Sequence, residues 1–175
     1  NISTIILGEK QGITIADSNS LVIKDVKITA NGLIINATSN ESKVELDNTI
    51  LEGNVFNQGS LTIKNTNSVS NITGTGETEI ISTGKLTTSE LVQNELVNNG
   101  VLTVNNLQIT TSANNSGTIT NNGLTSSIKN LTNTGIIDGT GNLELSGDST
   151  NKGTISQAII KVSGTLDNTL GNLSA

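Results

Sequence analysis

Three pairs of carboxylates come nearest, by residue type and spacing, to a catalytic site. The pairs are Glu77 with Glu79, Glu45 with Asp47, and Asp138 with Glu144. Two carboxyl groups at a suitable separation suffice to cleave a glycosidic bond, one as the acid and the other as base or nucleophile. Each pair is explained more simply as solvated residues on the outside of a strand. We therefore expect the protein not to be an enzyme.

The residue types that most other catalytic and metal sites need are missing from the chain. It has no His, Arg, Cys, Trp or Tyr. Nucleophilic triads that depend on His or Cys are excluded, and so are thiolate metal sites. Neither the nonapeptide nor the twelve-residue calcium motif is present. We expect no catalytic residue, no metal site and no cofactor.

A short recurring phrase indicates the elements that would position any site: a polar residue, any residue, Gly, any residue, then Leu or Ile. The last five of its glycines are separated by 16, 17, 18 and 18 residues. Such spacing is typical of a solenoid, in which each phrase marks one circuit of the chain. The phrase residues are Asn57, Asn98, Asn115, Asn133 and Asn151, then Gly59, Gly84, Gly100, Gly117, Gly135 and Gly153, then Leu61, Leu86, Leu102, Ile119, Ile137 and Ile155.

Each position of the phrase predicts a place in the coil. Side chains alternate between the two sides of a strand, so the aliphatic residues are predicted to share one interior column. The glycine two residues earlier is predicted to supply a tight or left-handed corner. For the asparagines we weighed a row that binds a polar ligand against an internal ladder, in which each amide bonds its copy one coil above. The ladder is favoured because the asparagines accompany the corner glycine.

A second internal similarity in the sequence supports the repeat. Gly74-Thr-Gly76-Glu-Thr-Glu79-Ile80 matches Gly139-Thr-Gly141-Asn-Leu-Glu144-Leu145 at an offset of 65 residues. Three to four coils of this length would span that offset.

Composition favours a narrow aliphatic core. The chain has 26 Asn, 26 Thr, 19 Ser and 18 Gly, and its apolar residues are nearly all Ile, Leu and Val. Stretches such as Leu61-Thr-Ile63 and Leu102-Thr-Val104 alternate with the period of a strand. We predict an all-β fold, a right-handed parallel β-helix of about nine coils at roughly 17–20 residues each. Residues 1–175 are predicted to form a single β-solenoid segment.

The start of the chain is less regular, and the coil is carried through it by short strands. These are predicted at Thr4–Leu7, Ile13–Ala16, Leu21–Ile23, Val26–Thr29, Leu33–Ile35 and Val44–Leu46.

Charge and hydropathy exclude two classes of partner. The formal net charge is −6 and all nine cationic residues are Lys, so nucleic acid is not an expected partner. No stretch approaches the roughly 18 apolar residues of a membrane span. The chain begins at Asn1 rather than Met, and we interpret it as a mature or excised segment of a longer protein.

The stretch Asn133-Thr-Gly-Ile-Ile-Asp-Gly-Thr-Gly-Asn-Leu-Glu-Leu-Ser-Gly-Asp-Ser-Thr-Asn-Lys-Gly-Thr-Ile155 resembles the repeats of bacterial autotransporter passengers and filamentous-haemagglutinin-like exoproteins. Those families form right-handed parallel β-helices on the cell surface, usually as stalks or adhesins. The resemblance is strongest over residues 98–155, and its style of repeat also occurs in phage tail proteins, archaeal adhesin-like proteins and carbohydrate lyases. It implies the fold and an extracellular or cell-surface location in a bacterium.

We expect a structural or adhesive segment of a bacterial cell-surface or secreted protein, a stiff stalk with a polar contact surface. Glycans or host surface proteins are its expected partners. One alternative is a self-assembling extracellular fibre subunit whose uncapped coils associate end to end. Others are a carboxylate-based polysaccharide-degrading enzyme and an ice-binding solenoid with a threonine row at Thr62, Thr87, Thr103 and Thr120.

Overall fold

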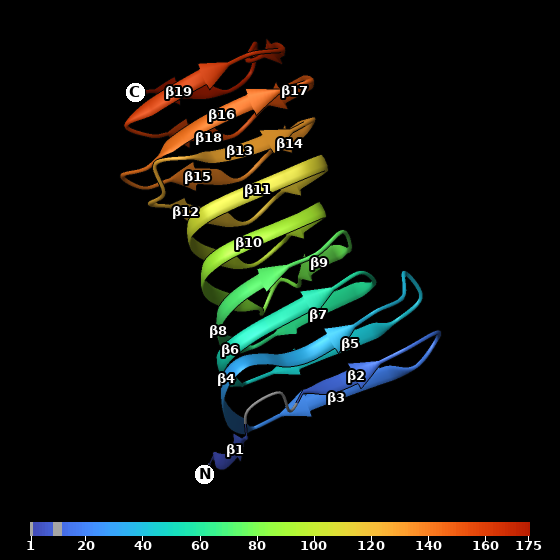
Figure 1. Cartoon of the computed structure of the whole chain (residues 1–175). Coiled ribbons are helices and arrows are strands. Elements are labelled where there is room, and N and C mark those ends of the chain that lie inside the picture. The colour runs from blue at the N-terminus through green and yellow to red at the C-terminus, as the bar shows by residue number, and fades with distance from the viewer. Residues whose placement is uncertain (1, 9–11) are drawn as a thin grey trace.

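The chain winds into one stack of parallel strands. The computed structural model describes residues 2–8 and 12–175, and these residues form 21 strands and no helix. Figure 1 shows the stack rising from the N-terminus at the bottom to the C-terminus at the top. The architecture is a parallel β-solenoid of about nine coils, which confirms the predicted fold class.

Each coil passes over three faces, which follow one another along the chain in the repeating order 1, 2, 3; the chain starts on face 2. On each face, strands of successive coils pair in parallel, up to β19 (Ile159–Val162), β20 (Thr165–Asp167) and β21 (Asn172–Ser174) at the top. Face 1 contains β3 (Ser20–Lys24), β5 (Lys43–Asp47), β7 (Ser60–Lys64), β9 (Glu77–Ile80), the ends of β10 (Lys85–Asn98) and β11 (Val101–Asn115), β14 (Leu131–Asn133), β17 (Asp148–Asn151) and β20 (Thr165–Asp167).

The other two faces share the long strands, which bend from one face to the next. Face 2 contains β1 (Ser3–Leu7), the starts of β4 (Val26–Ala37), β6 (Ile50–Asn57), β8 (Thr66–Thr73), β10 and β11, then β12 (Thr118–Asn121), β15 (Ile136–Asp138), β18 (Thr154–Ser156) and β21 (Asn172–Ser174). Face 3 contains β2 (Ile13–Ile15), the ends of β4, β6 and β8, the middles of β10 and β11, then β13 (Ser126–Lys129), β16 (Asn142–Ser146) and β19 (Ile159–Val162).

The strands predicted for the irregular start of the chain lie where expected. One detail differs: the stretches predicted at Val26–Thr29 and Leu33–Ile35 are two arms of the single strand β4. Gly32 lies between them with φ of 125°, and the pairing of β4 with β6 changes register there. A positive φ of this size is readily adopted by glycine, so the strand turns a corner without ending.

The core is a narrow column of aliphatic side chains. Strands such as β16 alternate buried and partly exposed residues along their length, as the two-residue period requires. Among the described residues, the buried hydrophobic side chains are all Ile, Leu or Val apart from Ala37 and Ala113. Each larger aliphatic contributes about 1.5–3 kcal/mol on burial, so the stack is stabilised by many similar, small terms.

The aliphatic residues of the phrase occupy two columns, not the single column predicted. Five of them stack directly on one another on face 2, whereas Leu61 is equally buried on face 1, between Val44 and Thr78. The reason is that Asn57-Gln-Gly59 turns the chain from face 3 to face 1, while the later phrases turn it from face 1 to face 2. The stacked five are Leu86, Leu102, Ile119, Ile137 and Ile155.

The glycines of the phrase are needed for a different reason from the left-handed corner considered above. None of the six has a positive φ. Instead, each packs against main-chain oxygen of the coil below: a Cβ on Gly117 would lie less than 3 Å from the oxygen of Gly100, and one on Gly135 less than 3 Å from that of Gly117. The left-handed alternative was therefore wrong, and close stacking of backbone on backbone is what excludes a side chain.

The substitution Gly84→Ala tests this requirement. Its Cβ would meet the main-chain oxygen of Ile63, so we expect a loss of about 1–3 kcal/mol in unfolding free energy, the usual cost of overpacking. Thr83→Ala, at an exposed position in the same corner, is the matched control and should change stability by less than about 0.5 kcal/mol. Urea unfolding followed by circular dichroism measures both, and equal stability of the two variants would contradict the packing argument.

Candidate functional site

A row of stacked side-chain amides runs up the corner between face 1 and face 2. We call it the amide ladder. The side-chain nitrogen of each member donates to the side-chain oxygen of the next, at distances of 2.7, 2.7, 2.7 and 2.6 Å from bottom to top. Its members are Asn98, Asn115, Asn133, Asn151 and Asn168.

The ladder also ties each coil to the main chain above it. The nitrogen of Asn98 lies 3.0 Å from the carbonyl oxygen of Thr118, and that of Asn115 lies 3.1 Å from the oxygen of Ile136. The lower four amides are buried. Since a buried amide is costly unless it is hydrogen-bonded, the fold has room here for asparagine but not for a ligand between the amides.

The predicted asparagine set and the observed ladder differ at two residues. Asn57 lies outside the ladder, at the corner between face 3 and face 1. Asn168 belongs to the ladder but was not predicted, because Asn168-Thr-Leu-Gly171 carries one extra residue before its glycine. A search for Asn alone at the spacing of 16 to 18 residues would have found it.

The ladder begins at Asn98 because Ile80 occupies the corresponding place one coil below. Ile80 offers no donor, so the side-chain oxygen of Asn98 has no hydrogen-bond partner. Only one other buried side-chain atom of the described residues shares this condition, the oxygen of Asn106. An unsatisfied buried acceptor costs about 1–3 kcal/mol, which marks this corner as a weak point in the stack.

A second kind of amide bond skips one coil. Asn57 donates to Gln93 at 2.7 Å, and Asn121 donates to Gln157 at 2.6 Å, each across two coils. The intervening coil places a glycine with positive φ at that position, Gly74 in one case and Gly139 in the other. These two glycines are equivalent residues of the two similar segments that are 65 residues apart in sequence. The segments are similar because the same three-coil motif, an amide bond that spans a glycine corner, is built at two different corners.

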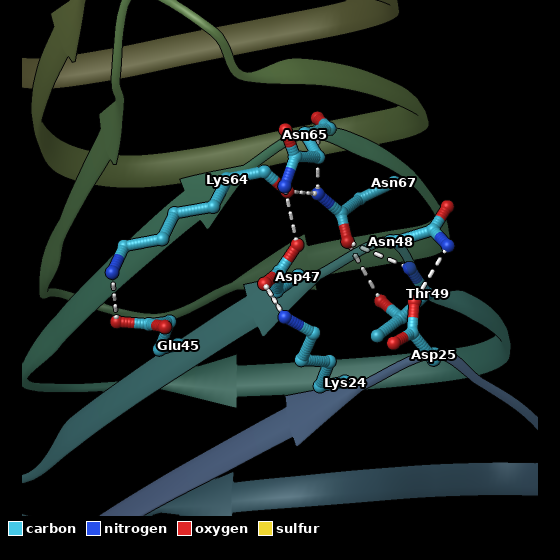
Figure 2. A network of polar contacts seen from close by, with 9 residues as sticks. All are labelled: Lys24, Asp25, Glu45, Asp47, Asn48, Thr49, Lys64, Asn65 and Asn67. Atoms are coloured by element: carbon cyan, nitrogen blue, oxygen red, sulfur yellow. Dashed lines mark hydrogen bonds and ion pairs between the residues drawn. The ribbon is translucent and has the colours of Figure 1, made fainter.

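The lower coils build the face 1–face 2 corner differently, from charged and amide side chains (Figure 2). Asp25, Asn48 and Asn65 turn the chain with φ of 51°, 56° and 54°, a conformation that Asn and Asp tolerate better than most residues. Asn48 donates to Asp25 at 2.7 Å. Single left-handed residues thus replace the longer glycine corner found above.

Asp47 is the most strongly held carboxylate of this corner (Figure 2). Asn65 donates to one of its oxygens at 2.6 Å, and the ammonium of Lys24 lies 3.1 Å from the other. The hydrogen bond from Asn65, followed by the contact with Lys24, lowers the pKa of Asp47 below its ordinary value. Its partner in the proposed pair, Glu45, is bound by Lys64 at 2.8 Å. Both carboxylates are therefore engaged in structural contacts.

Glu77 and Glu79 point outward from the same strand, β9, and Glu95 lies directly above Glu77. Partial burial, and then the charges of Glu95 and Glu79, raise the pKa of Glu77. A carboxyl group of raised pKa beside a second carboxylate is the arrangement that an acid–base pair requires. A shallow depression of about 220 Å³ lies here, lined by Asn40, Gln58, Ser60, Glu77, Asn94 and Glu95 among others.

The third pair is not brought together. Asp138 lies on face 2, where it accepts a hydrogen bond from Thr120 at 2.8 Å. Glu144 lies on face 3, 3.1 Å from the ammonium of Lys161. A corner of the coil separates the two carboxylates, so they do not face a common space.

The threonine row is shorter than predicted. Thr87, Thr103 and Thr120 are consecutive on face 2, and Asp138 follows them. Thr62 lies on face 1 instead. No group of three or more acidic residues in the described chain gathers closely enough to hold a metal ion, and none of its secondary structure is a helix that could cross a membrane.

Comparison with known proteins adds no relative: no family model, curated protein or solved structure matches this chain.

The amide ladder is tested by Asn133→Ala. The change removes two ladder bonds and the bond to the carbonyl oxygen of Thr154, and it leaves a buried donor of Asn115 unpaired. We therefore expect a loss of about 3 kcal/mol in unfolding free energy. Asn114→Ala, the same change at an exposed neighbouring asparagine, should cost less than about 0.5 kcal/mol. Chemical unfolding measures both variants. Similar losses in the two would show that the ladder contributes nothing specific.

The two shifted carboxylates predict opposite responses to pH. A lowered folded-state pKa means that ionised Asp47 stabilises the fold, and this contribution is lost as the pH falls through that pKa. A raised pKa means that ionised Glu77 destabilises the fold, and acidification relieves the penalty. At neutral pH, Asp47→Asn should therefore lower the melting temperature and Glu77→Gln should raise it, both differences shrinking in acid. Glu41→Gln, at an exposed site, is the control and should leave the melting temperature unchanged. Changes of the same sign in the melting temperatures of Asp47→Asn and Glu77→Gln would refute the opposite roles given to the two carboxylates.

Proposed function

We propose that this chain is a structural or adhesive segment of a bacterial cell-surface or secreted protein, acting as a stiff stalk. The observation that carries the proposal is the uninterrupted parallel pairing of all three faces from the bottom coil to the top. Because the hydrogen bonds between coils lie along the axis of the stack, bending or stretching it strains many of them together.

The outer surface supports the adhesive part of the proposal. Its rows are rich in hydroxyl and amide groups, such as Thr87 and Thr103 on face 2 and Asn54 and Asn71 on face 3. Groups of this kind donate and accept hydrogen bonds without fixed charge, as recognition of a glycan or a host surface protein requires. We place the segment outside the cell or on its surface, in keeping with the resemblance to exoprotein repeats.

A self-assembling fibre subunit is the second candidate. The observation that favours it is the direct stacking of like residues, Ile137 on Ile119 and Ile155 on Ile137, by which a coil of one copy can continue the stack of another. Strand edges with such residues pair readily with another chain. Sedimentation velocity distinguishes the two: filaments that grow with concentration support the fibre, and a concentration-independent monomer supports the stalk.

Removal of one whole coil tests the stalk. Deleting residues 101–117 removes one coil and connects Gly100 directly to Thr118, which follows Gly117 in the intact chain. Asn133 then lies directly above Asn98. A spacer built from interchangeable coils should still fold, and it should become shorter by one strand spacing of about 4.8 Å. Spin labels on Thr66→Cys and Thr154→Cys, five coil steps apart, should give a narrow separation near 24 Å that shrinks by that amount.

Deletion of residues 101–109 is the matched control, because it removes only part of a coil and should abolish folding. A broad label separation in the intact chain would contradict stiffness. The enzyme alternative is checked on the same preparations: release of sugar from any polysaccharide, lost in Glu77→Gln, would overturn the assignment as a stalk.

A further inference from the structure

The corner at Asn99 and Gly100 differs chemically from the other corners of the stack. The sequence contains three Asn-Gly steps: Asn31-Gly32, Asn99-Gly100 and Asn122-Gly123. At such a step the glycine nitrogen can reach the asparagine side chain without hindrance from a Cβ. Whether the glycine nitrogen attacks the side-chain amide of the asparagine depends on how the fold holds both groups.

The amide nitrogen of Gly100 has no hydrogen-bond acceptor among the described residues. Its equivalents do: Gly117, Gly135 and Gly153 donate to the carbonyl oxygens of Asn98, Asn115 and Asn133. The difference comes from the coil below, whose corner has two extra residues, Ser82 and Thr83. The nitrogen of Asn99 donates to the oxygen of Ile80 at 2.8 Å, but that oxygen receives no second bond from Gly100, whereas in the coils above one carbonyl oxygen accepts from both corner nitrogens.

The side chain of Asn99 is held ready to react. It is exposed, and its oxygen accepts a hydrogen bond of 2.6 Å from the hydroxyl of Ser116. That donor withdraws electrons from the amide carbon and would stabilise the negative charge that forms on the oxygen during attack. The side-chain nitrogen of Asn99, which must leave, has no partner in the described structure and faces water.

We propose that Asn99 is a site of spontaneous deamidation, with Ser116 as the oxyanion donor. The nitrogen of Gly100 loses its proton to water and attacks the side-chain carbon of Asn99, forming a carbon–nitrogen bond. The bond to the side-chain nitrogen breaks, and ammonia leaves after taking up a proton. Water then opens the resulting succinimide ring at either carbonyl, giving aspartate or isoaspartate. Water is the sole co-reactant, and no electrons are exchanged with any oxidant.

Each of the other two steps lacks part of this arrangement. At Asn122 the side-chain oxygen does accept a hydrogen bond from the Thr140 hydroxyl, at 3.3 Å. The nitrogen of Gly123 donates to the side-chain oxygen of Asn121 at 3.2 Å, so it is not free to attack Asn122. At Asn31 the following glycine lies inside strand β4, and no hydroxyl donates to the asparagine oxygen in the described structure. The fold therefore selects one step of three that are alike in sequence.

The consequence of the reaction would be local and lasting. Aspartate adds a negative charge to a neutral corner, and isoaspartate adds a carbon atom to the main chain between stacked glycines that tolerate no extra atom. Both products arise beside the unsatisfied oxygen of Asn98, where the amide ladder begins. Age would thus loosen the stack at one defined level.

The test is to incubate the folded chain at mildly alkaline pH and follow each Asn-Gly peptide by mass spectrometry, with isoaspartate detected by enzymatic methylation. Asn99 should convert faster than Asn122 and Asn31. Chain unfolded in urea serves as the control, since the three steps should then react at similar rates. Ser116→Ala should slow Asn99 by about fivefold, the effect of one ordinary hydrogen bond on a rate, and leave Asn31 unchanged.

Ser116→Thr keeps the hydroxyl and should restore the rate at Asn99. Ser89→Ala, at an exposed site remote from the corner, should have no effect. Equal rates at Asn99 and Asn122 in the folded chain would overturn the proposal. So would a rate at Asn99 that is unchanged or increased in Ser116→Ala, because Ser116 would then be holding the side chain away from reaction.

Discussion

The structure depends on one constraint: each coil must lie directly on its neighbour at the separation set by backbone hydrogen bonds. At the corners this brings a carbonyl oxygen of one coil against the α-carbon of the next, as Gly100 and Gly117 illustrate. No side chain fits between them. The repeated glycines, the vertical alignment of the aliphatic residues and the stacked amides all follow from this requirement, because the backbone path of one coil restricts the residues that fit in the coil above.

The constraint explains which parts of the fold were predictable from sequence. Strict stacking forces Asn115, Asn133 and Asn151 to recur at nearly constant spacing, so the solenoid and the ladder could be inferred. The spacing does not reveal which corner a phrase occupies, since the same Asn-x-Gly residues can form a corner between different pairs of faces. Leu61 was therefore placed in the wrong column. Sequence also cannot distinguish a glycine required for φ, such as Gly74, from one required for space, such as Gly84.

The candidate sites were less predictable, because they depend on contacts between coils. Nothing near Asp47 in sequence indicates that Lys24 and Asn65, from coils below and above, will hold it. Asp138 and Glu144 are close in sequence but lie on different faces. Conversely, Glu77 and Glu95 are 18 residues apart and stack as neighbours. Once the coil length is known, pairs of residues that stack in adjacent coils can be predicted from the sequence. Pairs within one coil cannot, because their positions depend on where each corner turns the chain.

The amide ladder has a direction as well as a position. In all four of its bonds the side-chain nitrogen belongs to the lower coil and the oxygen to the coil above. The amide dipoles therefore add instead of cancelling, and hydrogen bonds in such a chain polarise one another. The strand dipoles on the three faces are not aligned with the axis in this way. The upper part of the rod consequently has an electrical polarity along its axis, with partial negative charge at Asn98 and partial positive charge toward Asn168.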